Sequence, residues 1–205
     1  IGASQLRWPS ELFDIGYYSR KYASELRSPA DSLIHFLTVG LKERYWPNEL
    51  FSVDYYLSTY FDVANAGVNP LEHYAANGVA EGRRPNPYFD TLFYANSNPD
   101  VTASGTHPLA HYIRSGAKEF RAPSAEFSTY FYWTMYPEVR NSELTPLGHY
   151  LSVGKSEGLL PSAHSNWKAA SFSKPLSELD LPVGNKVIVV IPVYSGYEIT
   201  RNCIT

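Results

Sequence analysis

The chain has 205 residues, a formal net charge of −3 at pH 7 and a single cysteine, Cys203. The near-neutral charge, without any long basic run, argues against a nucleic-acid-binding protein, and one cysteine excludes an internal disulfide. No apolar run approaches the roughly 18–20 residues of a membrane span, so none is expected.

Five residue types recur every 38 residues along most of the chain. They are Phe13, Phe51, Phe89 and Phe127; His35, His73, His111 and His149; Gly40, Gly78, Gly116 and Gly154; Glu43, Glu81, Glu119 and Glu157; and Pro47, Pro85, Pro123 and Pro161. A period held without insertions is the signature of a repeat architecture. We therefore define four segments, 13–50, 51–88, 89–126 and 127–164, after an N-terminal lead at 1–12.

The start of each segment predicts a short helix. The first Phe is followed by Asp or Ser, whose side chains cap helix N-termini; these residues are Asp14, Ser52, Asp90 and Ser128. Five residues after the Phe stands a tyrosine, at the spacing of a hydrophobic staple; these are Tyr18, Tyr56, Tyr94 and Tyr132. We expect this helix at about 53–60 in segment two, while Pro99 and Pro137 interrupt the pattern later.

The second half of each segment predicts another helix. Asn69 and Thr145 each precede a proline, which favours an N-cap followed by the first helical residue. Weaker versions of this signal are Asp31-Ser32 and His107-Pro108. The periodic glycines are interpreted as left-handed helix stops.

These elements predict an all-α fold of four tandem 38-residue helix-turn-helix repeats, with eight short helices in four pairs. Helices this short are marginal alone, so the α-repeat array must gain its stability from stacking between neighbouring segments. The first segment is the most divergent, as expected of a terminal capping unit.

The periodic polar and aromatic residues offer several candidate sites. Each segment supplies one histidine, so we interpret the histidines as structural, bonded to a neighbouring backbone or to the next segment's Glu, with metal binding as the alternative. We expect the tyrosines to pack in the core, with sugar stacking as the alternative. Glu81 and Arg83 are expected to brace their loop, with anion binding as the alternative. Candidates for a surface role are Trp46, Trp133 and Trp167.

The pattern stops after the fourth segment. Residues 165–185 are rich in Ser and Pro and are expected to form a linker. The β-branched run 186–191 is typical of a buried parallel strand. Strand, turn and helix in this order open a doubly wound α/β domain, which we expect to be truncated at Thr205.

Two parts of the chain resemble bacterial glycosyltransferases. The stretch Val187-Ile-Val-Val-Ile-Pro-Val-Tyr-Ser-Gly196 resembles the opening strand of family 2 enzymes of the GT-A type, with Ser195 in place of the customary Asn. The segments, with Glu81-Gly-Arg83, Pro85 and Asn98-Pro-Asp-Val101, are similar to units found N-terminal to such enzymes. Similar units also occur in some secreted, calcium-binding bacterial repeat proteins.

The resemblance implies a nucleotide-sugar pocket lined by Pro192, Val193 and Tyr194. It also implies that the acidic motif holding Mn²⁺ or Mg²⁺, and the catalytic base, lie further along the parent enzyme. No catalytic or metal-binding residue is therefore expected in this chain.

Two functions follow as hypotheses. In the first, the segments are the binding or assembly module of a bacterial, nucleotide-sugar-dependent glycosyltransferase of polysaccharide biosynthesis. Its partners would be a protein, a second copy or a glycan acceptor, and its location the cytoplasm, at the inner face of the membrane in the parent protein. The alternative is a non-enzymatic cell-surface or adhesion repeat protein, which the terminal strand disfavours.

Overall fold

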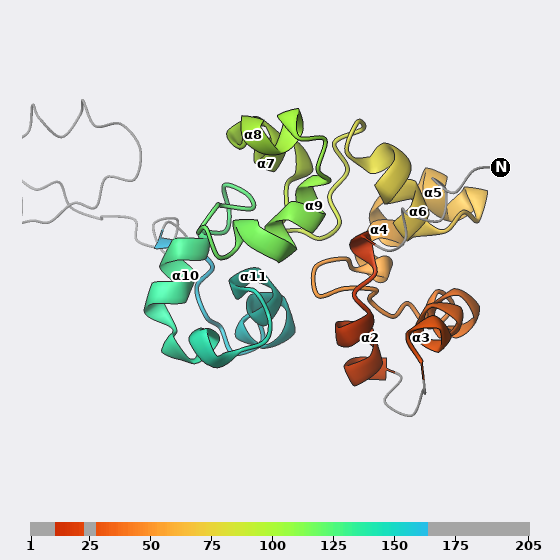
Figure 1. Cartoon of the computed structure of the whole chain (residues 1–205), viewed down its shortest axis with the longest axis horizontal. Helices are drawn as coiled ribbons and strands as arrows, with labels where there is room; N and C mark the ends of the chain where they lie inside the picture. The colour runs from red at the N-terminus through yellow and green to blue at the C-terminus, as the bar shows by residue number, and fades with distance from the viewer. Residues whose placement is uncertain (1–10, 23–27, 164–205) are drawn as a thin grey trace, which may run out of the picture. The chain divides into compact units, whose positions relative to one another are not determined.

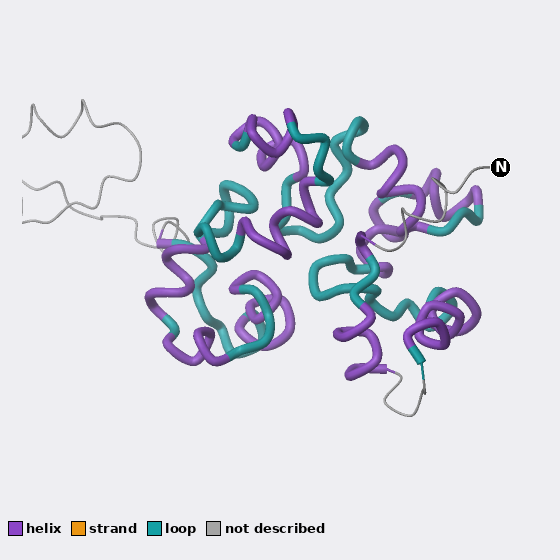
Figure 2. The backbone as a smooth tube through the Cα atoms, viewed as in Figure 1, coloured by secondary structure: helices purple, strands orange, loops and turns teal. Residues whose placement is uncertain are grey.

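The computed structural model describes residues 11–22 and 28–163 of the chain. Within these ranges the chain is mostly helical and contains no strand (Figures 1 and 2). The all-α class is therefore confirmed for this part. Several predictions fall outside the described residues: the linker 165–185, the strand 186–191, the nucleotide-sugar residues Pro192, Val193 and Tyr194, and also Trp167 and Cys203.

The helical pieces follow one another in the same order in successive segments (Figure 1). Segment one contains α2 (Ile15–Tyr22), α3 (Pro29–His35) and the π-helix η1 (Phe36–Gly40). Segment two contains α4 (Val53–Thr59), α5 (Phe61–Ala66), α6 (Pro70–His73) and the π-helix η2 (Tyr74–Gly78). Segment three contains α7 (Thr91–Ser97), α8 (Pro99–Ala103), α9 (Pro108–His111) and the π-helix η3 (Tyr112–Gly116). Segment four contains α10 (Thr129–Met135), the 3-10 helix η4 (Pro137–Asn141), α11 (Pro146–His149) and the π-helix η5 (Tyr150–Gly154).

The first helix of a segment ends close to where the sequence pattern predicts: α4 covers Val53–Thr59, against an expected range of about 53–60. Tyr60 leaves helical geometry with φ −111° and ψ 81°, and Asn98 and Tyr136 do so at the same place in segments three and four. A separate short helix begins at the next residue, which is Pro99 or Pro137 in those segments. A proline is harmless there because its missing N–H would have no partner in the first turn. In segments two to four the predicted helix pair is thus divided into four helical elements, of which the last two are contiguous.

The predicted N-caps of the first helices are confirmed. Asp14 Oδ1 accepts a hydrogen bond from the amide of Tyr17 at 2.8 Å, and the other three caps bond in the same way at 2.9–3.2 Å. The Phe before each cap packs on the staple tyrosine with ring centroids 5.1–5.3 Å apart. All these rings are buried, so the staple is also the core of its segment.

The caps of the later helices are mostly as predicted. Asn69, His107 and Thr145 each accept an amide hydrogen bond at the start of their helix. In segment one the prediction at Asp31-Ser32 was wrong, because Ser28 is the cap and its Oγ accepts from the Asp31 amide at 3.2 Å. A proline follows Ser28, so the same cap-and-proline signal was present three residues earlier.

The periodic glycines do not adopt left-handed backbone, so that prediction was wrong. Left-handed residues lie four positions later: Arg44 (φ 58°), Gly82 (φ 66°), Phe120 (φ 56°) and Gly158 (φ 75°). The periodic glycines are instead needed for space. A Cβ would collide with the staple-tyrosine hydroxyl at Gly40, Gly116 and Gly154, and with the Tyr74 ring at Gly78.

A buried asparagine holds the boundary between segments. Asn86 is fully buried, and its Nδ2 donates to the carbonyl of Leu50 at 2.7 Å. Its Oδ1 accepts from the amides of Tyr88 at 2.8 Å and Phe89 at 3.0 Å. Asn48 makes the equivalent three bonds 38 residues earlier. Asn86 of segment two thus bonds to the last residue of segment one and to the first residue of segment three.

Pairs of buried side chains also join successive segments. Two hydrogen bonds of 2.9 Å do so, Tyr74 Oη with Thr91 Oγ1 and Tyr112 Oη with Thr129 Oγ1. The equivalent residues at the first junction are Phe36 and Val53, which are fully buried and carry no polar side-chain atom. Each junction is therefore matched, either polar with polar or apolar with apolar.

Candidate functional site

The periodic histidine lies against the staple tyrosine of its own segment. Four hydrogen bonds of 2.9–3.0 Å join the tyrosine hydroxyl to the histidine Nδ1: Tyr18–His35, Tyr56–His73, Tyr94–His111 and Tyr132–His149. Burial raises the pKa of these tyrosines well above its usual value. We therefore assign the hydroxyl as donor and Nδ1 as acceptor. The histidines are structural, but the predicted partners, a backbone group or the next segment's Glu, were wrong.

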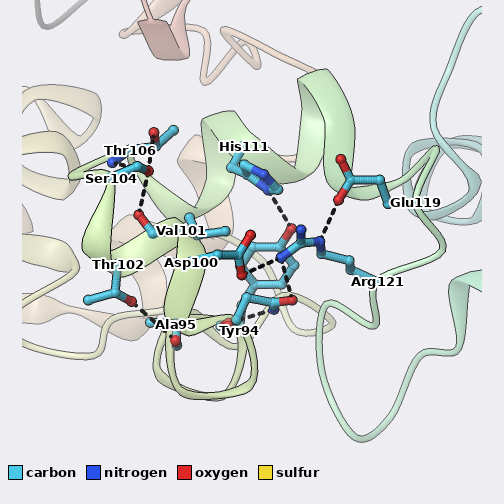
Figure 3. A network of polar contacts seen from close by, with 11 residues as sticks. Tyr94, Ala95, Asp100, Val101, Thr102, Ser104, Thr106, His111, Glu119 and Arg121 are labelled. Carbon is cyan, nitrogen blue, oxygen red and sulfur yellow. Dashed lines mark hydrogen bonds and ion pairs between the residues drawn. The ribbon is translucent and has the colours of Figure 1, made fainter.

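In segment three a charged network lies around this pair (Figure 3). Arg121 donates to Asp100 Oδ1 at 2.8 Å and to Asn98 Oδ1 at 2.9 Å. Its Nε pairs with Glu119. The Arg121 hydrogen bond lowers the pKa of Asp100. One guanidinium thus ties the end of the segment to the helices at its start.

Segment two contains the same arrangement. Arg83 binds both oxygens of Asp62, at 2.7 and 2.8 Å, and also pairs with Glu81. Its guanidinium lies 4.8 Å from the centroid of the Tyr60 ring. The Arg83 hydrogen bonds lower the pKa of Asp62 to about 2. The prediction that Glu81 and Arg83 brace their loop is confirmed.

This network holds the fold together and is not shared by all segments. At the position where segments two and three have Arg, segment one has Tyr45 and segment four has Leu159. The Tyr45 ring stacks on the Tyr22 ring, with the ring centroids 4.2 Å apart. Each group of the network bonds to another residue of the same segment. Within residues 11–22 and 28–163, no three His, Cys, Asp or Glu side chains gather as metal ligands would.

Residues that depart from the 38-residue pattern gather elsewhere. Phe120 has left-handed backbone where segments two and four have Gly, a conformation that costs of order 1–3 kcal/mol for other residues. Its ring packs edge-on against Trp133 at 5.1 Å and Tyr130 at 5.6 Å. The Arg140 guanidinium lies 4.4 Å from the centroid of Trp133. The residues equivalent to Trp133 have no aromatic ring: Ser19, Leu57 and Ala95.

A cavity of about 500 Å³ lies beside this cluster. This volume is within the range of small-molecule sites, roughly 300–1,000 Å³. Its apolar wall is formed by side chains that include Phe120, Trp133, Val139 and Leu144. Its charged groups are Lys118 and Arg140 and the carboxylates of Asp14, Glu49 and Glu143.

Glu49 contributes a buried carboxylate to this wall. It is 5% exposed, and its Oε2 accepts a hydrogen bond from the amide of Thr145 at 2.9 Å. Burial raises the pKa of Glu49 to about 7, although the hydrogen bonds from Thr145 oppose the shift. Gly148 leaves room for this carboxylate, since a Cβ there would collide with it. The equivalents of Gly148 all have side chains: Ile34, Glu72 and Ala110.

Of the residues that line this cavity, sequence reasoning proposed a surface role for Trp133 alone, and it predicted Asp14 and Thr145 as helix caps. Trp46 is half-buried elsewhere, with the Lys21 ammonium 5.4 Å from its ring centroid. Glu49 and Gly148 were missed because neither belongs to the periodic pattern. The signal that could have found them is their departure from that pattern.

No helix of the described ranges is long and apolar enough to cross a membrane. Comparisons with family models, curated proteins and solved structures found no match to the chain.

Proposed function

We propose that the four segments are copies of one unit, stacked as an α-helical repeat array that serves as a binding and assembly module. Three features support the copies. Each segment has the same cap, staple and tyrosine–histidine bond. The amide of each first cap also donates to the carbonyl of the segment's closing proline, as Ser52 does to Pro85 at 3.0 Å. The asparagine and hydroxyl bonds then link one copy to the next.

The observation that supports a binding role is that the periodic polar groups bond to one another within their own segment. Tyr94 bonds His111, and Arg121 bonds Asp100 and Glu119, all within segment three. These groups stabilise the copies and are not arranged around a reacting centre. The surface residues that vary between copies are then available to recognise a partner, as in other repeat proteins.

We further propose that the parent protein is a family 2 glycosyltransferase. The support is the resemblance of residues 187–196, in which Pro192, Val193 and Tyr194 would contact the nucleotide-sugar. Manganese or magnesium would be held by an acidic motif further along the parent chain. The module would work in the cytoplasm, placing the enzyme on a growing glycan, on a protein partner or on a second copy of itself.

Reading the parent gene beyond codon 205 separates this proposal from a surface or adhesion protein. An Asp-x-Asp motif downstream supports the enzyme, whereas glycine- and aspartate-rich nonapeptides support the surface protein. A longer chain that carries the motif but neither binds a nucleotide-sugar nor transfers a sugar would refute the enzyme proposal.

The binding role is tested on the 205-residue chain itself. Light scattering measures self-association, a glycan array measures carbohydrate binding, and cross-linking in cells captures protein partners. A chain that stays monomeric, binds no glycan and captures no partner would contradict the proposal.

A further inference from the structure

We propose that the cavity beside Phe120, Trp133 and Glu49 binds a neutral saccharide of one or two hexose rings. This inference gives the binding module a small ligand, but it does not depend on the parent being an enzyme. It rests on the described residues alone.

The first argument is that residues which depart from the 38-residue pattern lie together at the wall of this cavity. Phe120 occupies a left-handed position that favours Gly, and its ring joins the wall of the cavity. Trp133 and Arg140 extend this wall, where segment three has Ala95 and Thr102 in the equivalent places. Arg44 has the same backbone in segment one, so the argument rests on Phe120, Trp133 and Arg140 lying together at one cavity and not on the strain alone.

The second argument is that Glu49 and Gly148 form a matched pair across the chain. The loop between segments one and two carries the carboxylate, and α11 of segment four lacks the side chain that would exclude it. Burying a carboxylate is unfavourable unless it is hydrogen-bonded. Oε2 is anchored by the Thr145 amide, which fixes the carboxylate at the cavity wall.

The third argument concerns the chemistry of the wall. The apolar C–H face of a pyranose packs on an aromatic ring, and its hydroxyl groups both donate and accept hydrogen bonds. Phe120 is 38% exposed and offers ring surface. Glu49 and Asp14 supply acceptors, Lys118 and Arg140 supply donors, and all four line one cavity. A neutral polyol uses both kinds of group.

The charge of the wall disfavours an ionic ligand. Three carboxylates stand beside one lysine and one arginine. Two of the charged groups also interact with other side chains: the Arg140 guanidinium lies over the Trp133 ring, and Glu143 pairs with Arg20 at 3.2 Å. The cavity therefore has no strong excess of one charge that would attract an anion or a cation.

The test measures binding of defined sugars to the 205-residue chain. Glucose, galactose, mannose, N-acetylglucosamine and their disaccharides are titrated at millimolar concentrations, followed by saturation-transfer NMR and tryptophan fluorescence. The comparison ligands are free phenylalanine, as a zwitterion, and glucuronic acid, as an anion. We expect saturable binding of at least one neutral sugar and none of the comparison ligands.

Phe120→Gly is the decisive variant, because it restores the residue that segments two and four have at this position. We expect sugar binding to weaken about tenfold, the loss of one aromatic contact, while the melting temperature does not fall. Arg44→Gly is the matched control, since Arg44 has the same left-handed backbone in segment one and does not line the cavity. This control should bind as the native chain does.

Three results would overturn the inference. They are the absence of binding by every neutral sugar, preferred binding of phenylalanine or glucuronic acid, and native sugar affinity in Phe120→Gly. Failure here leaves self-association and protein capture untouched, so it is distinguishable from failure of the binding module as a whole.

Discussion

The role of the periodic glycines can be tested at Gly116. Its backbone is not left-handed, and an added Cβ would collide with Tyr94 Oη and lie 3.2 Å from His111 Nδ1. Gly116→Ala therefore tests whether the glycine is needed for space. If the glycine were needed for its backbone conformation, Gly116→Ala would cost the same free energy of unfolding whether or not Tyr94 is changed.

The expected magnitude follows from three contributions. Replacing Gly by Ala in a helix normally stabilises it by about 1 kcal/mol. Forcing a methyl group into packed space costs typically about 1–3 kcal/mol, and losing the Tyr94–His111 hydrogen bond costs about 1 kcal/mol more. We therefore expect Gly116→Ala to lower the free energy of unfolding by about 2 kcal/mol.

The assay is a double-mutant cycle with Tyr94→Phe, followed by thermal and urea unfolding. Gly116→Ala should lower the melting temperature by about 4–8 °C, given about 2–4 °C per kcal/mol for a chain of this length. Once Tyr94 loses its hydroxyl, the same change should be neutral or stabilising. The coupling between the two sites should then be about 2–3 kcal/mol.

Gly105→Ala is the control for backbone strain. Gly105 has φ 68° with no atom within 4 Å of an added Cβ, so alanine should cost about 1 kcal/mol with or without Tyr94→Phe. If Gly116→Ala is equally costly in both backgrounds, as this control is, then the glycine is not needed for space.

Three further predictions concern buried polar groups. The folded-state pKa of Glu49 is about 7, against 4.5 when exposed, so raising the pH across that interval should remove roughly 3 kcal/mol of stability. Glu49→Gln should abolish this loss. If urea unfolding shows the same pH dependence in Glu49→Gln as in the native chain, the prediction is contradicted. Burial lowers the pKa of His107 to about 4 from 6.5, so stability should rise by roughly 3 kcal/mol between those values, and His107→Asn, which copies the cap of segment two, should remove the rise. Asn86→Ala removes three buried hydrogen bonds and should cost about 3 kcal/mol; Asn86→Ser, which copies Ser124, should cost less, and equal losses would contradict a hydrogen-bonding role.

Local signals in the sequence predicted much of the fold. Ser52 and its equivalents were identified as caps because capping depends on residues only three positions apart. The burial of Phe51 and Tyr56 followed from the staple spacing in the same way. The separate helix α5 (Phe61–Ala66) was missed because segment two has no proline at its start, unlike segments three and four.

Contacts between distant residues were harder to predict. The tyrosine–histidine bond joins residues 17 positions apart, and nothing in the period says which neighbour the histidine contacts. Glu49 and Thr145 are 96 positions apart, so their contact depends on how the helices pack. Their departure from the pattern marks them as unusual, but only the structure brings them to one cavity.

The matched junctions limit how a chain of this kind can lengthen. Segment three carries Thr91 at its front and Tyr112 at its back, so a duplicate inserted after it would meet a threonine and keep its hydroxyl pair. Segment two carries Val53 at its front and Tyr74 at its back. A tandem duplicate of segment two would bury the Tyr74 hydroxyl against a valine, which can neither donate nor accept. Gene duplication or design should therefore extend the chain by copying segment three and leave segment two single.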